Sequence, residues 1–343
     1  MRIWFNHWFS TAYHLIRLMR AGVSEPFFVL GSNRNPLALY REVCDEWHVE
    51  PNCTDDDEYA AFCLDFCREH EVEIFVPRHR LIALAERQEQ FTRQGVRLLC
   101  GENTALLRTL DDKARTYSLF EQWGFKCVPE HRVIRSVDKF RQACEELRSR
   151  YGRICYKLAK DEGASTFRVL DETFDQAGAL FRVPGAKIAL VTAERILTAY
   201  DFAVPVLVMP WLTGPEISVD CLATKQGPLI LPRYKSDHRY ETIRFDGALM
   251  TLCQQILEHL RLNAPLNLQF RLHEGKLFLL EINPRMSGGL QLACTATAIN
   301  VPALALKQLL GMETSWSYPG WQERHVAHLE MPICLGTGEG DFP

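Results

Sequence analysis

The first hundred residues alternate short apolar runs with stretches of helical periodicity. The apolar runs predict strands at residues 2–5, 27–30, 73–76 and 96–100. Apolar positions three and four residues apart predict helices at residues 11–21, 59–69 and 81–94. Because strands alternate with helices, we expect a parallel sheet with helices on both faces.

The rest of the chain contains longer helical patterns and several buried strands. Helical periodicity predicts helices at residues 113–123, 138–151, 246–260, 290–298 and 301–310. Apolar runs predict strands at residues 153–158, 204–212 and 216–222. The length of 343 residues suits two or three domains or lobes.

Two apolar-rich runs, residues 266–272 and 277–282, flank a short turn that contains Gly275, and this pattern predicts a β-hairpin. Gln269 and Glu281 are each six residues from Gly275. If the hairpin is symmetric about this glycine, the two side chains face each other, which requires a loop of odd length. A two-residue Glu-Gly turn would instead place them on opposite faces.

Oxygen-bearing side chains gather at the end of this hairpin. Asn283 shares the face of Glu281 because it follows two residues later, and with Gln269 the three would converge on one spot. Hard oxygen ligands suit Mg²⁺, which also takes phosphate oxygens. Arg285 adds a planar guanidinium for phosphate or carboxylate. The alternative is an ordinary amphipathic hairpin, but a glutamate among apolar neighbours needs a partner.

Two lysines are further candidates. Lys157 stands between Tyr156 and Leu158 in a predicted strand, and a lysine among apolar neighbours is costly unless it meets an anion. Lys113 follows two aspartates at the start of a predicted helix. The alternative for Lys113 is a surface lysine after an acidic N-cap.

The string from Glu281 to Gly288, Glu-Ile-Asn-Pro-Arg-x-Ser-Gly, resembles the metal-binding hairpin of the ATP-grasp superfamily, especially its carbamoyl-phosphate-synthase and biotin-carboxylase branch. The family pattern has Glu or Gln on one strand and Glu-x-Asn-x-Arg at the end of the next. The resemblance implies that Gln269, Glu281 and Asn283 are metal ligands. It also implies that Arg285 is catalytic and holds the substrate carboxylate or its acyl phosphate.

The resemblance extends to the phosphate-binding positions. Lys113 and Lys157 match two family lysines that approach the ATP phosphates, and we expect Lys157 to be catalytic as well. Residues 161–167 occupy the place of a mobile glycine-rich loop, but only Gly163 remains there. Backbone N–H groups of this loop could still cradle phosphate.

The expected nucleotide site includes a hinge between two lobes. In the family, backbone groups of the hinge hold the adenine edge, and here they belong to Met209, Pro210, Trp211 and Leu212. The usual hinge glutamate is replaced by Met209 or Pro210. Glu216 matches the acidic residue that takes the ribose hydroxyls.

The resemblance covers about residues 1–312 and implies an α/β fold class, α+β in the grasp lobes. A Rossmann-like pre-ATP-grasp domain is expected at residues 1–104. A two-lobed ATP-grasp fold would follow, with the N-terminal lobe at residues 105–210. The C-terminal lobe, with the metal-binding hairpin, would span residues 211–343.

The implied activity is that of an ADP-forming ATP-grasp ligase that makes C–N bonds. A substrate carboxylate would attack the γ-phosphate of ATP, and an amine would then displace phosphate from the acyl phosphate. The implied cofactors are ATP and two Mg²⁺ ions, with Mn²⁺ as an alternative. Two interpretations stay open: another ATP-grasp phosphoryl transfer or carboxylation, and a non-catalytic ATP-binding regulator.

The substrate side offers two groups of residues. The turn after the first strand lacks the Gly-x-Gly-x-x-Gly fingerprint, so we expect no NAD there. It carries His7 and Trp8, which could form a wall of the substrate pocket, or Trp8 could simply pack. Arg233 and Lys235 belong to a basic group that we expect in a loop between the lobes, either neutralising phosphate or carboxylate or solvated.

Composition narrows the class of protein. The net charge of −4 gives no hint of a nucleic-acid or membrane partner. Twelve scattered cysteines without a CxxC motif predict reduced thiols in a cytoplasmic protein, and their spacings do not match common zinc modules. The apolar runs are too short to span a bilayer, and the N-terminus does not read as a signal peptide. A homodimer is one assembly left open, and the glycine-rich tail at residues 336–343 is expected to be mobile.

Overall fold

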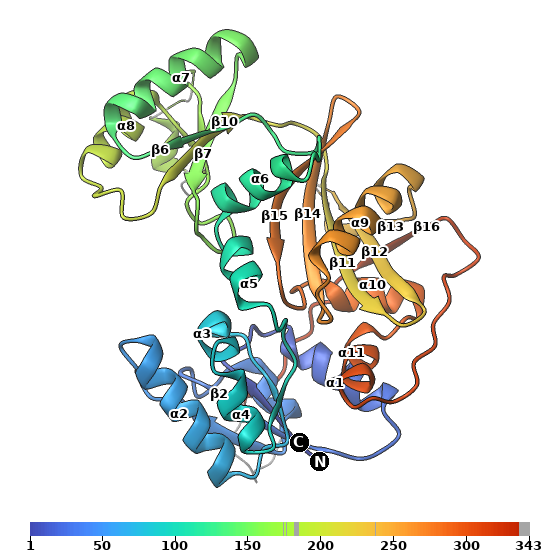
Figure 1. Ribbon diagram of the computed structural model, residues 1–343. Coiled ribbons are helices and arrows are strands. Elements are labelled where there is room, and N and C mark those ends of the chain that lie inside the picture. Colours follow the sequence, from blue (N-terminus) through green and yellow to red (C-terminus); the bar gives the residue numbers. More distant parts are fainter. Residues whose placement is uncertain (174, 176, 182–184, 237, 336–343) are drawn as a thin grey trace. The chain divides into compact units, whose positions relative to one another are not determined.

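Figure 1 shows the computed structural model, which describes residues 1–173, 175, 177–181, 185–236 and 238–335. The chain forms two compact units. Unit 1 comprises Met1–Arg108, Ile217–Leu268 and Ile282–Pro343, and unit 2 comprises Thr109–Glu216 and Gln269–Glu281. The expected boundaries at residues 104 and 210 stay predictions, and the expected mobile tail lies outside the described residues.

Unit 1 begins with the parallel sheet that the sequence predicts. Its order is β3-β2-β1-β4-β5, and each neighbouring pair is parallel. The strands are β1 (Arg2–Asn6), β2 (Phe28–Asn33), β3 (Glu46–Val49), β4 (Ile74–Val76) and β5 (Arg97–Leu98). The helices are α1 (Ala12–Gly22), the 3₁₀-helix η1 (Leu39–Val43), α2 (Asp56–Glu69), α3 (Leu81–Ala85), α4 (Gln88–Arg93) and α5 (Thr104–Leu110), which runs on into unit 2. The predicted helix at residues 81–94 is thus two helices.

Successive side chains of β1 alternate between the two faces of this sheet and pack into the core on each face. Trp4 is fully buried on one face, where its ring stacks on Phe66 at 4.2 Å and on Phe75 at 4.1 Å. Ile3 and Phe5 point to the opposite face, in a core that includes apolar residues of α1. Burial of such large apolar side chains contributes roughly 1.5–3 kcal/mol each, so both helical layers are held to the sheet.

The remainder of unit 1 is built on antiparallel strands. These are β11 (Glu216–Thr224), β12 (Gly227–Lys235), β13 (Tyr240–Arg244) and β16 (Glu323–Ala327), paired in that order. The helices of this part are α9 (Gly247–Leu260), α10 (Leu290–Thr297) and α11 (Val301–Leu309), and α11 packs beside α1 (Figure 1). The expectation of a loop at Arg233 and Lys235 is wrong, because both residues belong to β12.

Unit 2 holds a second five-stranded sheet, of order β6-β10-β7-β8-β9. Its strands are β6 (Arg132–Ile134), β7 (Ile154–Leu158), β8 (Arg168–Leu170), β9 (Lys187–Ile188) and β10 (Val206–Pro210). The helices are α6 (Lys113–Gln122), α7 (Val137–Tyr151), η2 (Gly178–Phe181) and α8 (Leu190–Thr198). Residues of α7 and α8 share one core with the sheet, whereas Tyr117 of α6 belongs to the core on the other side of β7.

The predicted hairpin is present as β14 (Leu266–His273) and β15 (Lys276–Asn283), at one edge of a sheet of order β15-β14-β11-β12-β13-β16. Its turn is the two residues Glu274 and Gly275, with φ angles of 49° and 74°. This is the tight turn that favours residues with positive φ, and the odd-length loop that we expected is wrong. An uninterrupted ladder from this turn would place Gln269 and Glu281 on opposite faces, so their convergence stays a prediction.

The cysteines are free thiols, and Cys334 is the exposed one among the described residues. Burial raises the pKa of the Cys63 thiol well above its usual value, which keeps it protonated and unreactive. Within the described part of the chain, no helix combines the length and apolarity that crossing a membrane requires.

Candidate active site

The first group of candidate residues lies in unit 2, at the start of α6. Asp112 caps this helix by accepting two backbone N–H hydrogen bonds, and the helix begins at Lys113. The Lys113 ammonium lies 2.6 Å from Asp161 Oδ1 and 3.2 Å from Glu281 Oε2. Burial alone would lower the pKa of Lys113, but the charges of Glu281 and Asp161 outweigh it and raise that pKa. Lys113 is therefore a buried cation between two carboxylates.

Lys157 lies beside this group on β7. Strand alternation places it on the same face as Cys155, which packs in one core with Tyr117 of α6. Its ammonium donates to the carbonyl oxygen of Leu280 at 3.1 Å, and the Tyr117 hydroxyl donates to the same oxygen at 2.9 Å. Burial, and then the charge of Lys113, lower the pKa of Lys157 to about 8. The structure thus brings together Lys113, Lys157 and Glu281, three residues that the sequence singled out.

Asp161 and Thr166 fold the loop at residues 161–167 back on itself. Asp161 Oδ2 accepts from the Thr166 hydroxyl at 2.7 Å and from its N–H at 3.3 Å. The N–H of Leu158 donates to the same hydroxyl at 2.9 Å. Gly163 and Ala164 both have positive φ, at 63° and 57°. Three backbone N–H groups of the loop, those of Ser165, Thr166 and Phe167, are therefore already bound within it, and a phosphate-cradling role stays a prediction.

The expected hinge residues are the last two of β10, Met209 and Pro210, and the two that follow it, Trp211 and Leu212. Met209 is buried, and Pro210 ends the strand. The N–H of Trp211 donates to the carbonyl oxygen of Arg153 at 2.9 Å, and the Arg153 guanidinium lies 4.3 Å from the Trp211 ring centre. Leu212 is buried. The backbone N–H of Trp211 is thus already bound to the residue that precedes β7, and the adenine-binding role of the hinge stays a prediction.

Glu216 starts β11 and forms an ion pair with Arg271 on β14, at 3.0 Å. Gly214, between the hinge and Glu216, has φ +95°, and a Cβ there would lie 2.2 Å from the carbonyl oxygen of Leu272. Only glycine fits that position, so the hinge is held tightly against the hairpin. Gln269 is half-buried on β14, and Asn283 ends β15 two residues after Glu281.

A surface groove of about 570 Å³ is lined in part by the hinge residues. It is lined by Pro210 to Thr213 together with residues of the hairpin tip and of the α7–β7 connection, including Arg150, Arg153, His273 and Phe278. Lys113, Lys157 and Glu281 do not line it. We therefore keep the lysine cluster, and not this groove, as the candidate phosphate site.

Arg233 lies in strand β12 of unit 1, and not in the loop where the sequence analysis placed it. Its Nε donates to Asp220 at 2.8 Å, its Nη1 to Glu241, and its Nη2 to Ser218 at 2.9 Å and Ser287 at 3.0 Å. Its side chain is only 3% exposed. Protein groups therefore engage all three nitrogens of Arg233, which favours a supporting role over charge neutralisation of a substrate. Lys235 lies at the exposed end of β12, and its role in neutralising phosphate or carboxylate stays a prediction.

Trp8 is buried within unit 1. It is 4% exposed, its indole N–H donates to the carbonyl oxygen of Val76 at 2.8 Å, and its ring packs edge-on against Phe5. These contacts favour the packing interpretation of Trp8, since little of its surface is left for a ligand. If this loop forms a wall of the substrate pocket, residues other than Trp8 must supply it.

Phe9, the next residue, is half-buried and contacts two arginines. The guanidinium of Arg78 lies 3.8 Å from its ring centre, and that of Arg285 lies 5.1 Å away. Both distances fit cation–π interactions. Unit 1 therefore joins Arg285, a predicted catalytic residue, to the loop after β1.

Several buried polar atoms near this loop make no hydrogen bond to any described residue. They are Thr11 Oγ1, Arg34 Nε and His79 Nε2, whereas His7 Nδ1 lies 3.6 Å from Glu50 Oε2. His7, Arg34 and His79 follow the carboxyl ends of β1, β2 and β4, where α/β sheets bind ligands. The rings of His7 and His79 lie 4.9 Å apart, and burial lowers the pKa of His79 to about 4. Buried polar atoms usually have partners, so this sheet edge suits a polar ligand.

The chain and its fold can be compared with known proteins. Residues 202–331 match the model of a family described as ATP-grasp in the biosynthetic pathway with Ter operon. The biotin carboxylase domain of 2-oxoglutarate carboxylase from Hydrogenobacter thermophilus aligns with a TM-score of 0.65 and 13% identity, over 92% of this chain and 71% of that chain. The chain has the ATP-grasp fold.

Two other solved ATP-grasp structures align over the same extent. Biotin carboxylase from Campylobacter jejuni has a TM-score of 0.67 and 13% identity, over 92% of this chain and 72% of that one. N5-carboxyaminoimidazole synthetase from Staphylococcus aureus, complexed with ADP, has a TM-score of 0.64 and 10% identity, over 92% of this chain and 78% of that one. The expected fold class is confirmed, and the resemblance to ATP-grasp proteins, biotin carboxylases among them, holds at the level of the fold.

The sequence analysis did not single out several residues of these two candidate sites. Asp161 is one of two carboxylates on Lys113, yet the two lie 48 positions apart and no local pattern joins them. Tyr117 was hidden in an amphipathic helix. Arg78 follows β4, and its place after a strand of a parallel sheet was the signal that could have identified it.

Proposed function

We propose that the chain is an ATP-dependent carboxylate–amine ligase that works through an acyl phosphate and releases ADP and phosphate. The observation that carries the proposal is the buried group Lys113, Lys157, Asp161 and Glu281 in unit 2. Two of the aligned structures support the choice of nucleotide: one is a complex with MgADP, ADP and bicarbonate, and another is a complex with ADP.

Among the residues of this group, the Lys157 ammonium would be stabilised most by a bound anion. Its charged form is disfavoured by burial, and the partner that the structure gives its ammonium is a backbone carbonyl. A polyphosphate bound beside it would supply the missing negative charge. Lys113 would also attract the phosphates, but less strongly, because two carboxylates already balance its charge.

The oxygen donors near Lys113 fit a magnesium ion. Glu281 supplies a carboxylate 19% exposed, and strand alternation directs the Asn283 amide to the same face. Gln269 would be the third metal ligand. This requires an interruption of the β14–β15 pairing between the turn and Glu281, which would bring Gln269 to the face of Glu281. When bound, Mg²⁺ would neutralise charge on the β- and γ-phosphates and orient the γ-phosphoryl group. Because Lys113 now contacts Glu281, the lysine and the metal would compete for this carboxylate.

The acceptor carboxylate would bind in unit 1, at Arg285. A guanidinium can hold a carboxylate or an acyl phosphate through two parallel hydrogen bonds. Phe9 packs on the Arg285 guanidinium and restricts its orientation. His79 Nε2, which makes no hydrogen bond to a described residue, would contact another polar group of the same substrate.

The reaction would then proceed in two displacements. A substrate carboxylate oxygen forms a bond to the γ-phosphorus, and ADP leaves with the bridging oxygen. An amine next attacks the acyl carbon, and phosphate leaves with the oxygen that came from the carboxylate. Lys157 and Lys113 would stabilise the charge on the transferred group, and Arg285 would stabilise the oxyanion.

An ADP-release assay separates this proposal from its alternatives. The full chain is incubated with ATP and Mg²⁺ against pools of amino acids and small carboxylates, with and without an amine pool, and with bicarbonate alone. The proposal predicts ADP release that requires a carboxylate and increases with the amine. Release with bicarbonate alone would indicate carboxylation. Tight ATP binding without release under any condition would indicate a regulator.

The pH dependence of nucleotide binding tests Lys157. Binding of a polyphosphate raises the pKa of Lys157 from its value of about 8 in the free protein, so binding takes up a proton above that pH. Affinity for a non-hydrolysable ATP analogue should be constant from about pH 7 to 8 and then fall, by up to roughly tenfold per pH unit. Lys157→Arg should abolish this decline because its guanidinium stays charged. Identical pH profiles for both proteins would refute the assignment.

Substitutions in the loop after β1 test the acceptor site. Phe9→Ala should raise the KM for the carboxylate by about tenfold, because it removes the support of Arg285, a loss of roughly 1–3 kcal/mol. The KM for ATP should not change. Trp8→Phe, which keeps most of the buried packing, should leave the KM for the carboxylate within about twofold. An effect of Trp8→Phe larger than that of Phe9→Ala would restore Trp8 as the pocket residue.

A further inference from the structure

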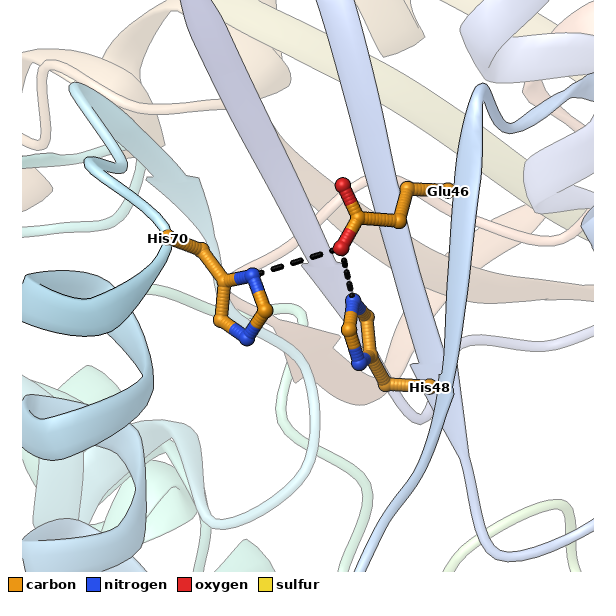
Figure 2. A group of neighbouring side chains, drawn as sticks. All are labelled: Glu46, His48 and His70. Atoms are coloured by element: carbon orange, nitrogen blue, oxygen red, sulfur yellow. Dashed lines mark hydrogen bonds and ion pairs between the residues drawn. The ribbon is translucent and has the colours of Figure 1, made fainter.

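A second group of side chains with metal-binding chemistry lies in unit 1, at the edge of the parallel sheet. Glu46 and His48 share one face of the edge strand β3, because they are two residues apart. His70 is the residue that ends α2, and its N–H donates to the carbonyl oxygen of Phe66. Figure 2 shows the Glu46 carboxylate between the two imidazole rings.

The three ligand atoms already lie at nearly the spacing that a metal ion requires. Glu46 Oε1 is 2.7 Å from His48 Nε2 and 3.3 Å from His70 Nδ1, and the three atoms all lie within 4.8 Å of one another. Ligand atoms around a tetrahedral zinc ion are roughly 3.3 Å apart, given metal–ligand bonds of about 2.0–2.1 Å. Small side-chain rotations would therefore suffice to place one ion among them.

Neighbouring residues hold these ligands in position. The ring of Phe66 contacts both imidazoles, with ring centres 4.9 Å from that of His48 and 4.2 Å from that of His70. Arg2 binds the other oxygen of Glu46 at 3.2 Å, which leaves Oε1 directed at the histidines. Such outer contacts orient metal ligands and tune their affinity. Burial, and then the charge of His48, lower the pKa of His70, so this ring is neutral at neutral pH.

We propose that Glu46, His48 and His70 bind one divalent transition-metal ion of the zinc class. Two imidazoles and a carboxylate suit Zn²⁺, Co²⁺ or Ni²⁺, whereas Mg²⁺ prefers oxygen ligands alone. The three side chains are between 24% and 36% exposed, so water can fill the remaining coordination position. The ion would tie β3 to the end of α2. This site is separate in composition from the oxygen ligands proposed for the nucleotide's metal, and it does not depend on that proposal.

Zinc titration of the full chain tests the site. The measurement uses calorimetry with ZnCl₂ and excess Mg²⁺, in a Cys334→Ser background that removes the exposed thiol. We expect one Zn²⁺ per chain, and His48→Ala, His70→Ala and Glu46→Gln should each weaken binding by at least about tenfold. His259→Ala, on the surface of α9, is the matched control and should bind as tightly as the parent.

A second readout guards against variants that are simply less stable. Zn²⁺ should raise the melting temperature of the parent and of His259→Ala, but not that of His48→Ala or His70→Ala. The visible spectrum with Co²⁺ should report a tetrahedral site of nitrogen and oxygen ligands, without thiolate charge-transfer bands. Absence of zinc binding by the parent, or equal affinity in the ligand variants and the control, would overturn the proposal.

Discussion

Glu281→Gln should lower Mg²⁺-dependent ADP release by at least about 100-fold while the protein remains folded. Glutamine keeps the shape of the side chain but removes the charge that would hold the metal. The fold should persist because Lys113 retains Asp161, the nearer of its two carboxylates at 2.6 Å. Steady-state ADP release, with circular dichroism of both proteins, makes the comparison.

Glu274→Gln is the control for this substitution. Glu274 lies in the exposed two-residue turn of the same hairpin, so its replacement should leave ADP release within about twofold. Near-parental release by Glu281→Gln would remove Glu281 from the metal site. A similar loss in both variants would point to damage of the hairpin and not to a lost ligand.

Arg233→Leu should lower the free energy of unfolding by about 3–5 kcal/mol. The substitution leaves the carboxylates of Asp220 and Glu241 without the cation that both contact, and Asp220 is only 3% exposed. Burial alone would lower the pKa of Arg233, yet these two carboxylates raise it, so the guanidinium stays charged. Urea unfolding followed by tryptophan fluorescence measures the loss.

Arg239→Leu provides the matched comparison. Arg239 pairs with Glu330 at 3.2 Å, but their side chains are 88% and 79% exposed. A pair so open to water contributes at most about 1 kcal/mol, so this variant should unfold almost as the parent does. An equally small loss in Arg233→Leu would mean that the buried network does not support this part of unit 1.

The same Arg233 shows where sequence patterns fail. Residues 227–235 contain Pro228 and Pro232, which usually interrupt strands, so β12 was not predicted and Arg233 was placed in a loop. In the structure, Pro232 pairs with Val219 within an antiparallel ladder. The four partners of Arg233 come from three separate segments, which no local pattern could connect.

The parallel sheet of unit 1 and the site around Lys113 and Lys157 were easier to predict than β12 and the contacts of Arg233. Strand–helix alternation sufficed for β1, β2, β4 and β5, because each apolar run is short and bounded by a helix. Lys157 was found because an isolated lysine inside an apolar strand is unusual, and the structure places it beside Lys113 and Glu281 in one group. Strand β3 was missed because its four residues, Glu-Trp-His-Val, include only two apolar ones.

The hairpin shows the limit of reasoning from spacing. Equal distances of Gln269 and Glu281 from Gly275 suggested a symmetric loop, whereas the turn uses Glu274 and Gly275 alone. Backbone conformation decides such a turn, since both residues adopt positive φ. Residue counting could therefore locate the hairpin and its acidic end, but not its register.

Isotope transfer tests the central claim most directly. The carboxylate found in the ADP-release screen is labelled with oxygen-18 and incubated with the full chain, ATP, Mg²⁺ and the amine, and the released phosphate is analysed by mass spectrometry. An acyl-phosphate route predicts one labelled oxygen from the carboxylate in each phosphate released. ADP formation with unlabelled phosphate would contradict the account, because it would show that the carboxylate never attacked the γ-phosphorus.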